Sequence, residues 1–423
     1  MNEEFLYYVW KYKIFTDINL QTSDAKEVSI LKAGIHNKNS GPDFLNAQVK
    51  IDHQLWAGNV EMHVKSSDWY LHKHEEDTNY DAVILHVVWE HDVDVFMKNN
   101  KALATLELKN FVSKELLENY NSLVYHQQKF IPCENQLTTI DEFLLNNWLE
   151  RLYFERLEHK STFIKELLLD TNADFEAVLF QLLAKNFGLK VNGEPFLQLA
   201  TSMDFSVVRK ERFDLEQLTA LFFGQAGFLE EDLEEHYHQQ LKEKYRYLKH
   251  KHKLNSISKN AFQFFRMRPQ NFPTIRIAQL ASLLFAHQNL FSKLMNINKK
   301  EDFYDLFSFE VDAFWKTHFT FESDSKKSPK KLTKSFVDLI IINTIIPLKF
   351  VYLQSRGVVA ENGIIQLIKQ VSSEKNSIIS NFAALEIKAK NAMESQALIQ
   401  LKNNYCTKKR CLQCAIGNSL LRK

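Results

Sequence analysis

GPDF at residues 41–44 and GNVEMHVK at residues 58–65 are the stretches of sequence that decide our interpretation. Residues 58–65 alternate apolar and polar side chains, which is the pattern of a β-strand with one face in a core. Glu61, His63 and Lys65 fall on the opposite face, where neighbouring side chains stand roughly 6.6 Å apart. The Asp of the first stretch begins another alternating run and can supply a second carboxylate from an adjacent strand. Such a face can hold a divalent cation and its bound water.

This arrangement resembles the motif of the PD-(D/E)XK nuclease superfamily. In that motif an Asp follows Pro on one strand, and an acid stands shortly before a basic residue on the next strand. The resemblance implies that Asp43 and Glu61 bind Mg²⁺ or Mn²⁺ and that the chain cleaves DNA or RNA. The superfamily usually has Lys two residues after the second acid, whereas this chain has His63 there and Lys65 at the next position on the same face. His63 and Lys65 are therefore alternatives for the group that orients or deprotonates the attacking water.

The full length also resembles an uncharacterised bacterial family of about this size. The shared signatures are GPDF at residues 41–44, EMHVKSSDW at residues 61–69 and a cysteine-rich C-terminal segment. This second resemblance covers nearly the whole chain and implies no established activity.

Residue periodicity predicts the order helix, three strands, helix, strand in the N-terminal part, which agrees with the nuclease core. An acid of the first helix often joins the metal cluster in such nucleases, so the resemblance makes Glu4, or Glu3, a candidate third carboxylate. A solvated acid that complements the helix dipole is the alternative. The predicted elements are a helix at residues 3–15, strands at 27–35, 43–51, 55–65, 82–90 and 102–109, and a short helix from Trp69 capped by Ser67 and Asp68.

After residue 132 the apolar positions are spaced three and four apart, which predicts helices. We therefore predict an α+β protein, with a restriction-endonuclease-like mixed sheet and flanking helices at residues 1–132 and a mostly α-helical domain at residues 133–423. Glycines in residues 222–228 suit close packing of two helices, and the lysine-rich residues 323–334 suit an exposed linker. Predicted helices cover residues 140–167, 173–186, 215–229, 231–253, 274–296, 302–316 and about 335–404.

Three other polar motifs compete with this interpretation. His72 and His74 form His-x-His followed by Glu, as in cupin metal sites, but no second histidine motif with flanking glycines follows, so loop histidines are the preferred interpretation. His86 alternates with apolar residues, which predicts a buried core histidine. The triplet at residues 107–109 reproduces acid-x-Lys without a Pro-Asp partner nearby, and we rank it below the first pair of stretches.

The cysteines form a second candidate site. Cys406, Cys411 and Cys414 make a C-x4-C-x2-C pattern, and the remaining Cys133 lies at the junction of the two predicted domains. Four thiolates fit a tetrahedral zinc ion or a [4Fe–4S] cluster. Some nucleases related to the superfamily hold an iron–sulfur cluster with one remote and three clustered cysteines, although at another spacing. Structural zinc is our first expectation, with an iron–sulfur cluster and metal-free thiols as alternatives.

Two basic segments of the helical part are candidate phosphate contacts. Residues 242–253 concentrate lysines, and residues 266–276 combine three arginines with a proline-fixed loop that enters a helix. Guanidinium groups beside a helix N-terminus favour oxyanions. The alternative is that they form solvated faces or join helix ends. The candidate nucleic-acid contacts are Lys249, Lys251, Arg266, Arg268 and Arg276.

Composition and charge limit the function. The net charge of the 423 residues is +1, so any basic surface for nucleic acid must be local. The acidic N-terminus lacks an apolar run before a cleavage site, and charge and proline interrupt the apolar residues 336–352, so we expect a cytoplasmic protein without a membrane span. The expected function is a metal-dependent phosphodiesterase acting on nucleic acid. The alternative is a protein of nuclease fold with impaired catalysis that binds nucleic acid or acts as a scaffold.

Overall fold

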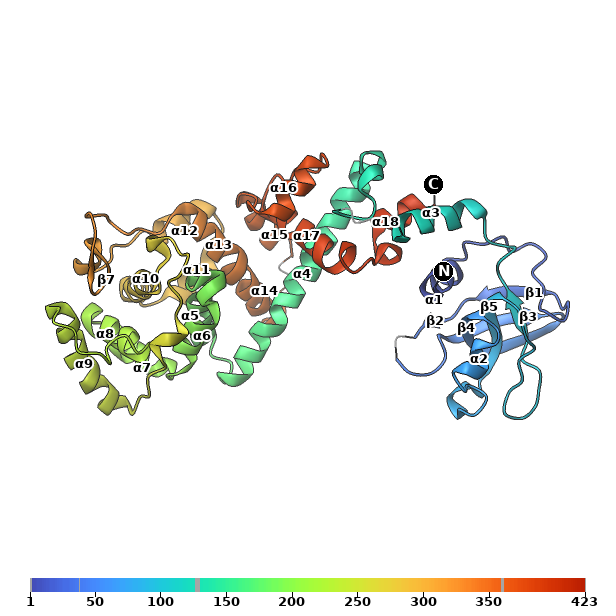
Figure 1. Cartoon of the computed structure of the whole chain (residues 1–423), viewed down its shortest axis with the longest axis horizontal. Helices are drawn as coiled ribbons and strands as arrows, with labels where there is room; N and C mark the ends of the chain where they lie inside the picture. The colour runs from blue at the N-terminus through green and yellow to red at the C-terminus, as the bar shows by residue number, and fades with distance from the viewer. Residues whose placement is uncertain (1, 38, 126–129, 359–360, 423) are drawn as a thin grey trace. The chain divides into compact units, whose positions relative to one another are not determined.

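The N-terminal part of the protein contains a mixed β-sheet (Figure 1). Its strands are β1 (Val28–Lys32), β2 (Ile35–His36), β3 (Phe44–Ile51), β4 (Gln54–Lys65), β5 (Val83–Glu90) and β6 (Thr105–Glu107), and its helices are α1 (Glu3–Lys11), α2 (Asp68–Leu71) and α3 (Lys114–Tyr125). β3 runs antiparallel to β1 and β4, whereas β5 runs parallel to β4 and β6. The predicted order of elements is therefore found, with β2 as an extra short strand beside β3.

The computed structural model describes residues 2–37, 39–125, 130–358 and 361–422. The chain forms two compact units: unit 1 comprises Met1–Trp148, Ala384–Glu386 and Leu401–Lys423, and unit 2 comprises Leu149–Ala383 and Ile387–Gln400. The last residues of the chain thus belong to the unit that contains the sheet, and the predicted boundary after residue 132 lies inside unit 1. The α+β class, with a mixed sheet and a helical C-terminal region, is confirmed.

Both faces of β4 are buried at the middle of the sheet. Val60 and Met62 are fully buried, as predicted, while Glu61 and His63 on the other face are only 5 % and 1 % exposed. α1 and α2 both contact this strand. Polar groups at this depth need hydrogen-bond or ionic partners, because burying them without partners costs free energy. The partners of Glu61 and His63 are therefore the first question for function.

The start of α2 differs from the prediction. Ser67 makes no capping bond; its hydroxyl donates instead to Asp92 Oδ2 at 2.8 Å, and its backbone N–H donates to Asp92 Oδ1 at 2.9 Å. Asp68 accepts a hydrogen bond from the backbone N–H of Lys65 at 3.0 Å. The sequence predicts that the Ser67 hydroxyl caps α2, but it donates its hydrogen bond to Asp92, which follows β5. A tertiary contact therefore replaces the predicted local one.

Unit 2 is helical, as predicted, and most helices lie where periodicity placed them. Two short helices, α6 and α7, were not predicted, and the segment predicted as one helix at residues 274–296 is divided into α10 and α11. The helices after the sheet are α4 (Glu142–Asp170), α5 (Phe175–Phe187), α6 (Leu189–Thr201), α7 (Phe205–Glu211), α8 (Leu215–Gln225), α9 (His236–His252), α10 (Pro273–Ala286), α11 (Leu290–Asn296), α12 (Lys300–Leu306), α13 (Lys334–Ile340), α14 (Ile346–Ser355), α15 (Glu361–Gln370), α16 (Ser377–Ala384), α17 (Ala392–Gln400) and, in unit 1, α18 (Ala415–Leu421).

The segment at residues 323–334 is only partly the exposed linker that its lysines predicted. Most of it is exposed, but a short strand, β8 (Ser323–Asp324), pairs with β7 (His318–Thr320). Lys330 is buried, its ammonium lies 3.3 Å from the centre of the Phe319 ring, and its carbonyl accepts a hydrogen bond from Gln279. A cation over an aromatic face can remain charged with little water around it, which explains how a lysine in a polar run becomes part of the core.

The apolar helix at Lys334–Ser355 is buried inside the protein, as predicted. Within the described residues it is the one helix long and apolar enough to cross a membrane by length and composition, with a mean hydropathy of 1.9. However, 72 % of its most apolar window is buried against other protein. A helix that is apolar on all sides and covered on all sides is typical of a protein core.

The glycines of residues 222–228 form a close contact between α8 and α9, which confirms the predicted packing elbow. A Cβ atom added at Gly224 would overlap the ring of Tyr245 on α9. Gly227 has φ of +78°, a conformation that a residue with a side chain rarely adopts, and an added Cβ would overlap the carbonyl oxygen of Ile257. The chain can therefore turn from one helix to the next only with glycine at these two positions.

We expect Gly224→Ala to lower the free energy of unfolding by about 1–3 kcal/mol, because the new methyl group must displace the Tyr245 ring from a packed core. Gly363→Ala is the matched control, since nothing lies within 4 Å of its added Cβ on α15. The control is expected to be neutral or stabilising by up to about 1 kcal/mol. Urea denaturation followed by circular dichroism measures both, and equal midpoints for the two variants would contradict the elbow.

Candidate functional site

A β-bulge between β3 and β4 sets the position of Asp43. Ala47 pairs with Gly58 and Phe44 pairs with Val60, so three steps along β3 correspond to two along β4. The extra residue is accommodated at Asn46, whose φ is +58°. One step beyond the Phe44–Val60 pair, this register puts Asp43 opposite Glu61. Without the bulge Asp43 would stand opposite the residue after Glu61 and face the other side of the sheet.

Two hydrogen bonds join Asp43 to Glu61 and to the next residue of β4, Met62. The backbone N–H of Asp43 donates to Glu61 Oε2 at 3.1 Å, and the backbone N–H of Met62 donates to Asp43 Oδ2 at 3.0 Å. Burial and then the charge of Glu61 raise the pKa of Asp43, and burial raises the pKa of Glu61. Two carboxylates so placed must share a proton or a cation, because two unbalanced negative charges at this depth are unfavourable.

Glu3, rather than Glu4, is the first-helix acid nearest to this pair. The hydroxyl of Tyr7 donates to Glu3 at 3.3 Å, and burial together with the charge of Asp43 raises the pKa of Tyr7, which keeps this phenol protonated. Glu4 is exposed. Because α1 turns about 100° per residue, adjacent acids cannot face the same neighbour, and the structure selects the one that the sequence left as the alternative.

Four histidines surround Glu61 and form a connected cluster. His63 Nδ1 lies 2.8 Å from His86 Nε2, and His63 Nε2 lies 3.1 Å from His72 Nδ1. Glu61 Oε1 lies 3.3 Å from His74 Nε2 and 3.6 Å from His63 Nε2. Ligand atoms of His63, His72 and His74 all lie within 4.8 Å of one another. Three imidazole nitrogens are thus collected around one small volume, with a carboxylate oxygen of Glu61 beside two of them, and such nitrogen donors suit a transition metal.

His72 and His74 were predicted to be ordinary loop histidines, and they lie instead in this cluster. The turn after α2 returns the chain over β4, and the ring of His74 stacks on Tyr80 with centroids 3.8 Å apart. His72 is exposed, so the cluster reaches solvent on its side. The His-x-His spacing was the signal in the sequence. It was discounted because a cupin barrel requires a second motif, whereas here the third histidine comes from the strand.

His63 and His86 occupy the deep end of the cluster. His86 is fully buried, as predicted for a core histidine, and its contact with Nδ1 fixes the ring of His63. Burial first, and then the neighbouring histidines, lower the pKa of His63 to about 2. His63 is therefore neutral, which is the form that binds metal ions and not a cationic replacement for lysine.

Lys65 lies at the exposed end of β4, beyond the acids and the histidines. The residue beside Glu61 is therefore His63.

The acid-x-Lys triplet at residues 107–109 has other contacts. Glu107 accepts a hydrogen bond from the backbone N–H of His91 at 2.8 Å, and Lys109 pairs with Glu90 at 3.2 Å. These contacts hold the ends of β5 and β6 together.

Arg276 is buried in unit 2, and the prediction that it contacts phosphate is wrong. Its guanidinium lies 3.8 Å from the centre of the Phe336 ring and donates hydrogen bonds to Asn271 at 2.7 Å and Gln279 at 2.9 Å. Burial lowers the pKa of Arg276 to about 10. Arg276 lies on α10 with its side chain in the core, where its hydrogen bonds join the preceding loop to this helix.

The other predicted basic contacts remain on the surface of unit 2. Lys249, Arg266 and Arg268 are exposed. Lys251 is exposed and pairs with the buried Glu211 at 2.8 Å. Their role in nucleic-acid binding stays a prediction, because exposure permits contact with phosphate without demonstrating it.

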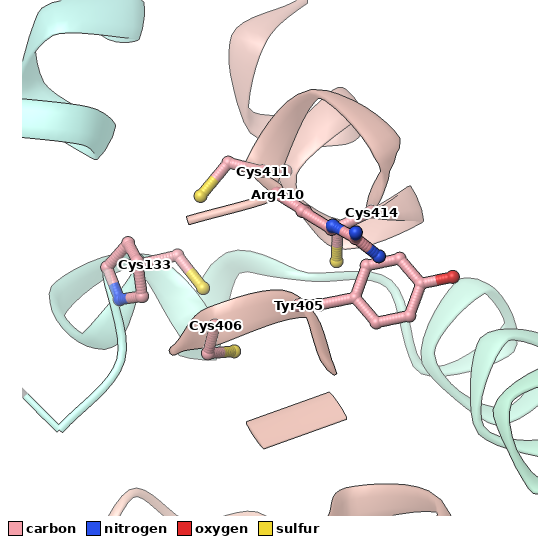
Figure 2. Close-up of a pocket in the computed structure, with 8 residues that line it drawn as sticks. Cys133, Tyr405, Cys406, Arg410, Cys411 and Cys414 are labelled. Atoms are coloured by element: carbon pink, nitrogen blue, oxygen red, sulfur yellow. The ribbon is translucent and has the colours of Figure 1, made fainter. Parts of the chain in front are cut away.

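The four cysteines, predicted to act together, line one pocket in unit 1 (Figure 2). All four are free thiols. Burial raises the pKa of Cys133 to about 12 and that of Cys411 to about 11, with the neighbouring thiols contributing in the same direction. The structure therefore brings together residues that are separated by more than half of the sequence.

The bulge at Asn46 supplies a test of how the acid pair is positioned. We expect Asn46→Val to lower the free energy of unfolding by about 1–2 kcal/mol, because a β-branched side chain is strained at positive φ. Asn46→Gly is expected to retain most of the stability, since glycine adopts this conformation freely. Thermal unfolding of both variants measures the difference. Equal loss in both would show that the asparagine side chain, and not the backbone conformation, is what matters.

Comparison with known proteins assigns the chain to a family without assigning an activity. No curated protein and no solved structure matches the chain. A family described as a protein of unknown function (DUF2851) matches residues 3–377, which include the acid pair, the histidine cluster and Cys133. The uncharacterised family suggested by the sequence signatures is thus confirmed over most of the length. The chain is a member of the DUF2851 family of proteins of unknown function.

Proposed function

We propose that the chain is a metal-dependent phosphodiesterase that cleaves DNA or RNA, with Asp43, Glu61 and the adjacent histidines as its metal-binding and catalytic residues. The observation that carries the proposal is that the buried Glu61 and the half-buried Asp43 lie opposite each other on neighbouring strands, where backbone N–H groups of Asp43 and Met62 hold the two carboxylates. Their repulsion and burial make the doubly charged pair unstable unless a proton or a cation offsets the charge, and a cation is what we propose. A site of this kind is unusual in a protein whose polar residues serve stability alone.

The arrangement of the sheet supports the same proposal. Asp43 and Glu61 lie on antiparallel neighbours, and the strand that follows the second acid runs parallel to it after a short helix. This is the order of elements that the resemblance to PD-(D/E)XK nucleases implies. The motif and the topology are independent observations, since residue identity does not determine how strands pair.

The donor set fits a divalent cation that accepts nitrogen ligands. Carboxylate oxygens alone suit Mg²⁺, whereas imidazoles suit Zn²⁺, and a mixture of both is compatible with Mn²⁺. Glu61 belongs to the acid pair and also contacts His74, so it can join the two halves of the site. We therefore extend the expectation of Mg²⁺ or Mn²⁺ to Zn²⁺ and expect weaker binding of Mg²⁺ than of the other two.

Such a cation, when bound, would lower the pKa of an attacking water and offset charge on the scissile phosphate. The histidines of the cluster would orient the groups around this cation. His86 holds the ring of His63 through Nδ1 and leaves Nε2 directed toward Glu61 and His72. His72, as the exposed member of the cluster, is placed to accept a proton from water or to hand one to a leaving group. Exposed Lys249, Arg266 and Arg268 are candidate contacts to the phosphate backbone, which give affinity without sequence preference.

One observation favours a second candidate, a protein that keeps this site but binds nucleic acid without cleaving it efficiently. A neutral His63 stands where the superfamily usually has a charged lysine, and Lys65 lies at the exposed end of the strand. A missing positive charge beside the scissile phosphate would slow the reaction and leave binding intact. Metal binding is common to both candidates, so cleavage is what distinguishes them.

We expect Mn²⁺ or Zn²⁺ to raise the melting temperature of the wild-type protein, because a ligand that binds only the folded state stabilises it. Glu61→Gln is expected to abolish most of this increase, since it removes the charge shared by the carboxylate pair and the histidines. Glu107→Gln is the matched control on β6 and is expected to respond like wild type. Differential scanning fluorimetry of metal-free protein with each cation tests this, and an increase that survives Glu61→Gln would place the cation elsewhere.

We expect the wild type to cleave a mixture of single- and double-stranded DNA and RNA in the presence of Mn²⁺, and Asp43→Asn to reduce the rate by at least about 100-fold, on the scale of losing one group that stabilises charge in the transition state. Glu107→Gln again serves as the control. Gel assays with EDTA-treated protein establish the dependence on metal. Binding without cleavage in wild type and Asp43→Asn alike would favour the second candidate, and equal cleavage by both would remove the proposed site.

A further inference from the structure

The four cysteines converge from two distant parts of the chain. Cys133 precedes the short 3-10 helix at Glu134–Thr139, and Cys406 ends a π-helical turn at Leu401–Cys406. Cys411 begins a 3-10 turn, and Cys414 is the residue before α18. Figure 2 shows the four thiols around a common space, with Tyr405 and Arg410 at its edge. A π-helical turn is rare and often marks a functional site.

The spacing of the thiols distinguishes between metal centres. A tetrahedral zinc ion with Zn–S bonds of about 2.3 Å holds its sulfur atoms about 3.8 Å apart. In the part of the chain that the structure describes, three ligand atoms lie within 4.8 Å of one another at the histidine cluster. Among these described residues, no three of the cysteine sulfur atoms lie that close together. The thiols share a pocket but are more open than a single zinc ion requires. A cluster of four irons, each bound to one thiolate, holds the sulfurs farther apart.

The surroundings of the thiols suit an anionic cluster. The backbone N–H groups of Ile416 and Gly417 donate to the sulfur of Cys414. An added Cβ at Gly417 would overlap the carbonyl oxygen of Cys411, so only glycine lets α18 approach the cysteine turn this closely. Arg410 lines the pocket, and its charge can offset part of that of four thiolates.

The cysteine-bearing segment is also fastened to the rest of unit 1 by ordinary contacts. Lys402 donates to the carbonyl oxygen of Phe130 at 2.7 Å, and the Tyr405 and Trp148 rings meet edge to face at 5.4 Å. The segment Leu401–Lys423 also packs against α1 and α3. A covalent centre with one ligand from Cys133 and three from the segment would close a long loop of chain, which is where a cross-link stabilises most.

We propose that Cys133, Cys406, Cys411 and Cys414 bind a [4Fe–4S] cluster that fastens residues 401–423 to the remainder of unit 1. Each thiol loses its proton as its sulfur binds one iron. The cluster is a structural centre, separate from the site at Asp43 and Glu61 in its ligands and in its chemistry. Its presence does not depend on the proposed phosphodiesterase activity.

The test is to purify the full-length chain without oxygen after expression with added iron, and to measure iron, acid-labile sulfide, zinc and the visible absorption spectrum. We expect about four irons and four sulfides per chain and a broad visible absorption band that bleaches on exposure to air. Cys414→Ser is expected to lose most of the iron and the absorption. Lys408→Ser, an exposed residue of the same segment, is the matched control and is expected to retain both.

The second measurement is limited proteolysis of the same samples. Residues 401–423 are expected to be cleaved faster after the cluster is lost in air and in Cys133→Ser, a variant on the opposite side of the centre. One zinc per chain in place of iron would overturn the cluster, and metal-free protein with an equally protected C-terminal segment would overturn the centre altogether. Neither result bears on the acid pair, because the cleavage assay of Asp43→Asn is independent of iron.

Discussion

The bulge between β3 and β4 is the constraint on which the candidate site depends. Side chains on adjacent residues of a strand point to opposite faces, so a shift of one residue in pairing would move Asp43 to the other side of the sheet. Asn46, with its positive φ, takes up the extra residue and brings Asp43 opposite Glu61. Once the two carboxylates face each other, their repulsion and burial require compensation, and the surrounding histidines provide donors for the cation that would compensate them.

Much of unit 1 could be predicted from the sequence, because each strand carries its own alternation and the motif residues fall at strand positions. The facing positions of Asp43 and Glu61 were predicted for that reason. The positions of His72 and His74 beside them were not predicted, since they depend on the turn after α2 returning over β4, and no local pattern records that return. Arg276 shows the opposite error: a loop rich in arginine suggested a phosphate contact, and packing against Phe336 placed the guanidinium inside.

The helical part was predicted as a class but less well in its boundaries. Periodicity located most helices, and glycines identified the close contact at Gly224 because only a missing side chain permits it. His287 lies between α10 and α11, and its ring contacts the carbonyl oxygen of Leu306 at 2.7 Å. Such a contact joins residues far apart in sequence, so a window of neighbouring residues cannot reveal it. The same reasoning applies to Lys330, a polar residue that an aromatic ring makes acceptable in the core.

The identity of residue 63, two positions after Glu61, affects both stability and chemistry. A lysine at this depth would balance one carboxylate charge by itself, as an ion pair does. His63 is neutral and balances none, so a proton or a bound cation must offset the charge of the two carboxylates. If the proposed cation binds there, its binding would be coupled to the folding of this part of unit 1. A histidine in place of lysine thus removes a built-in positive charge from beside the acids, and the neighbouring histidines add nitrogen donors, which would favour metals that accept nitrogen ligands in the site we propose.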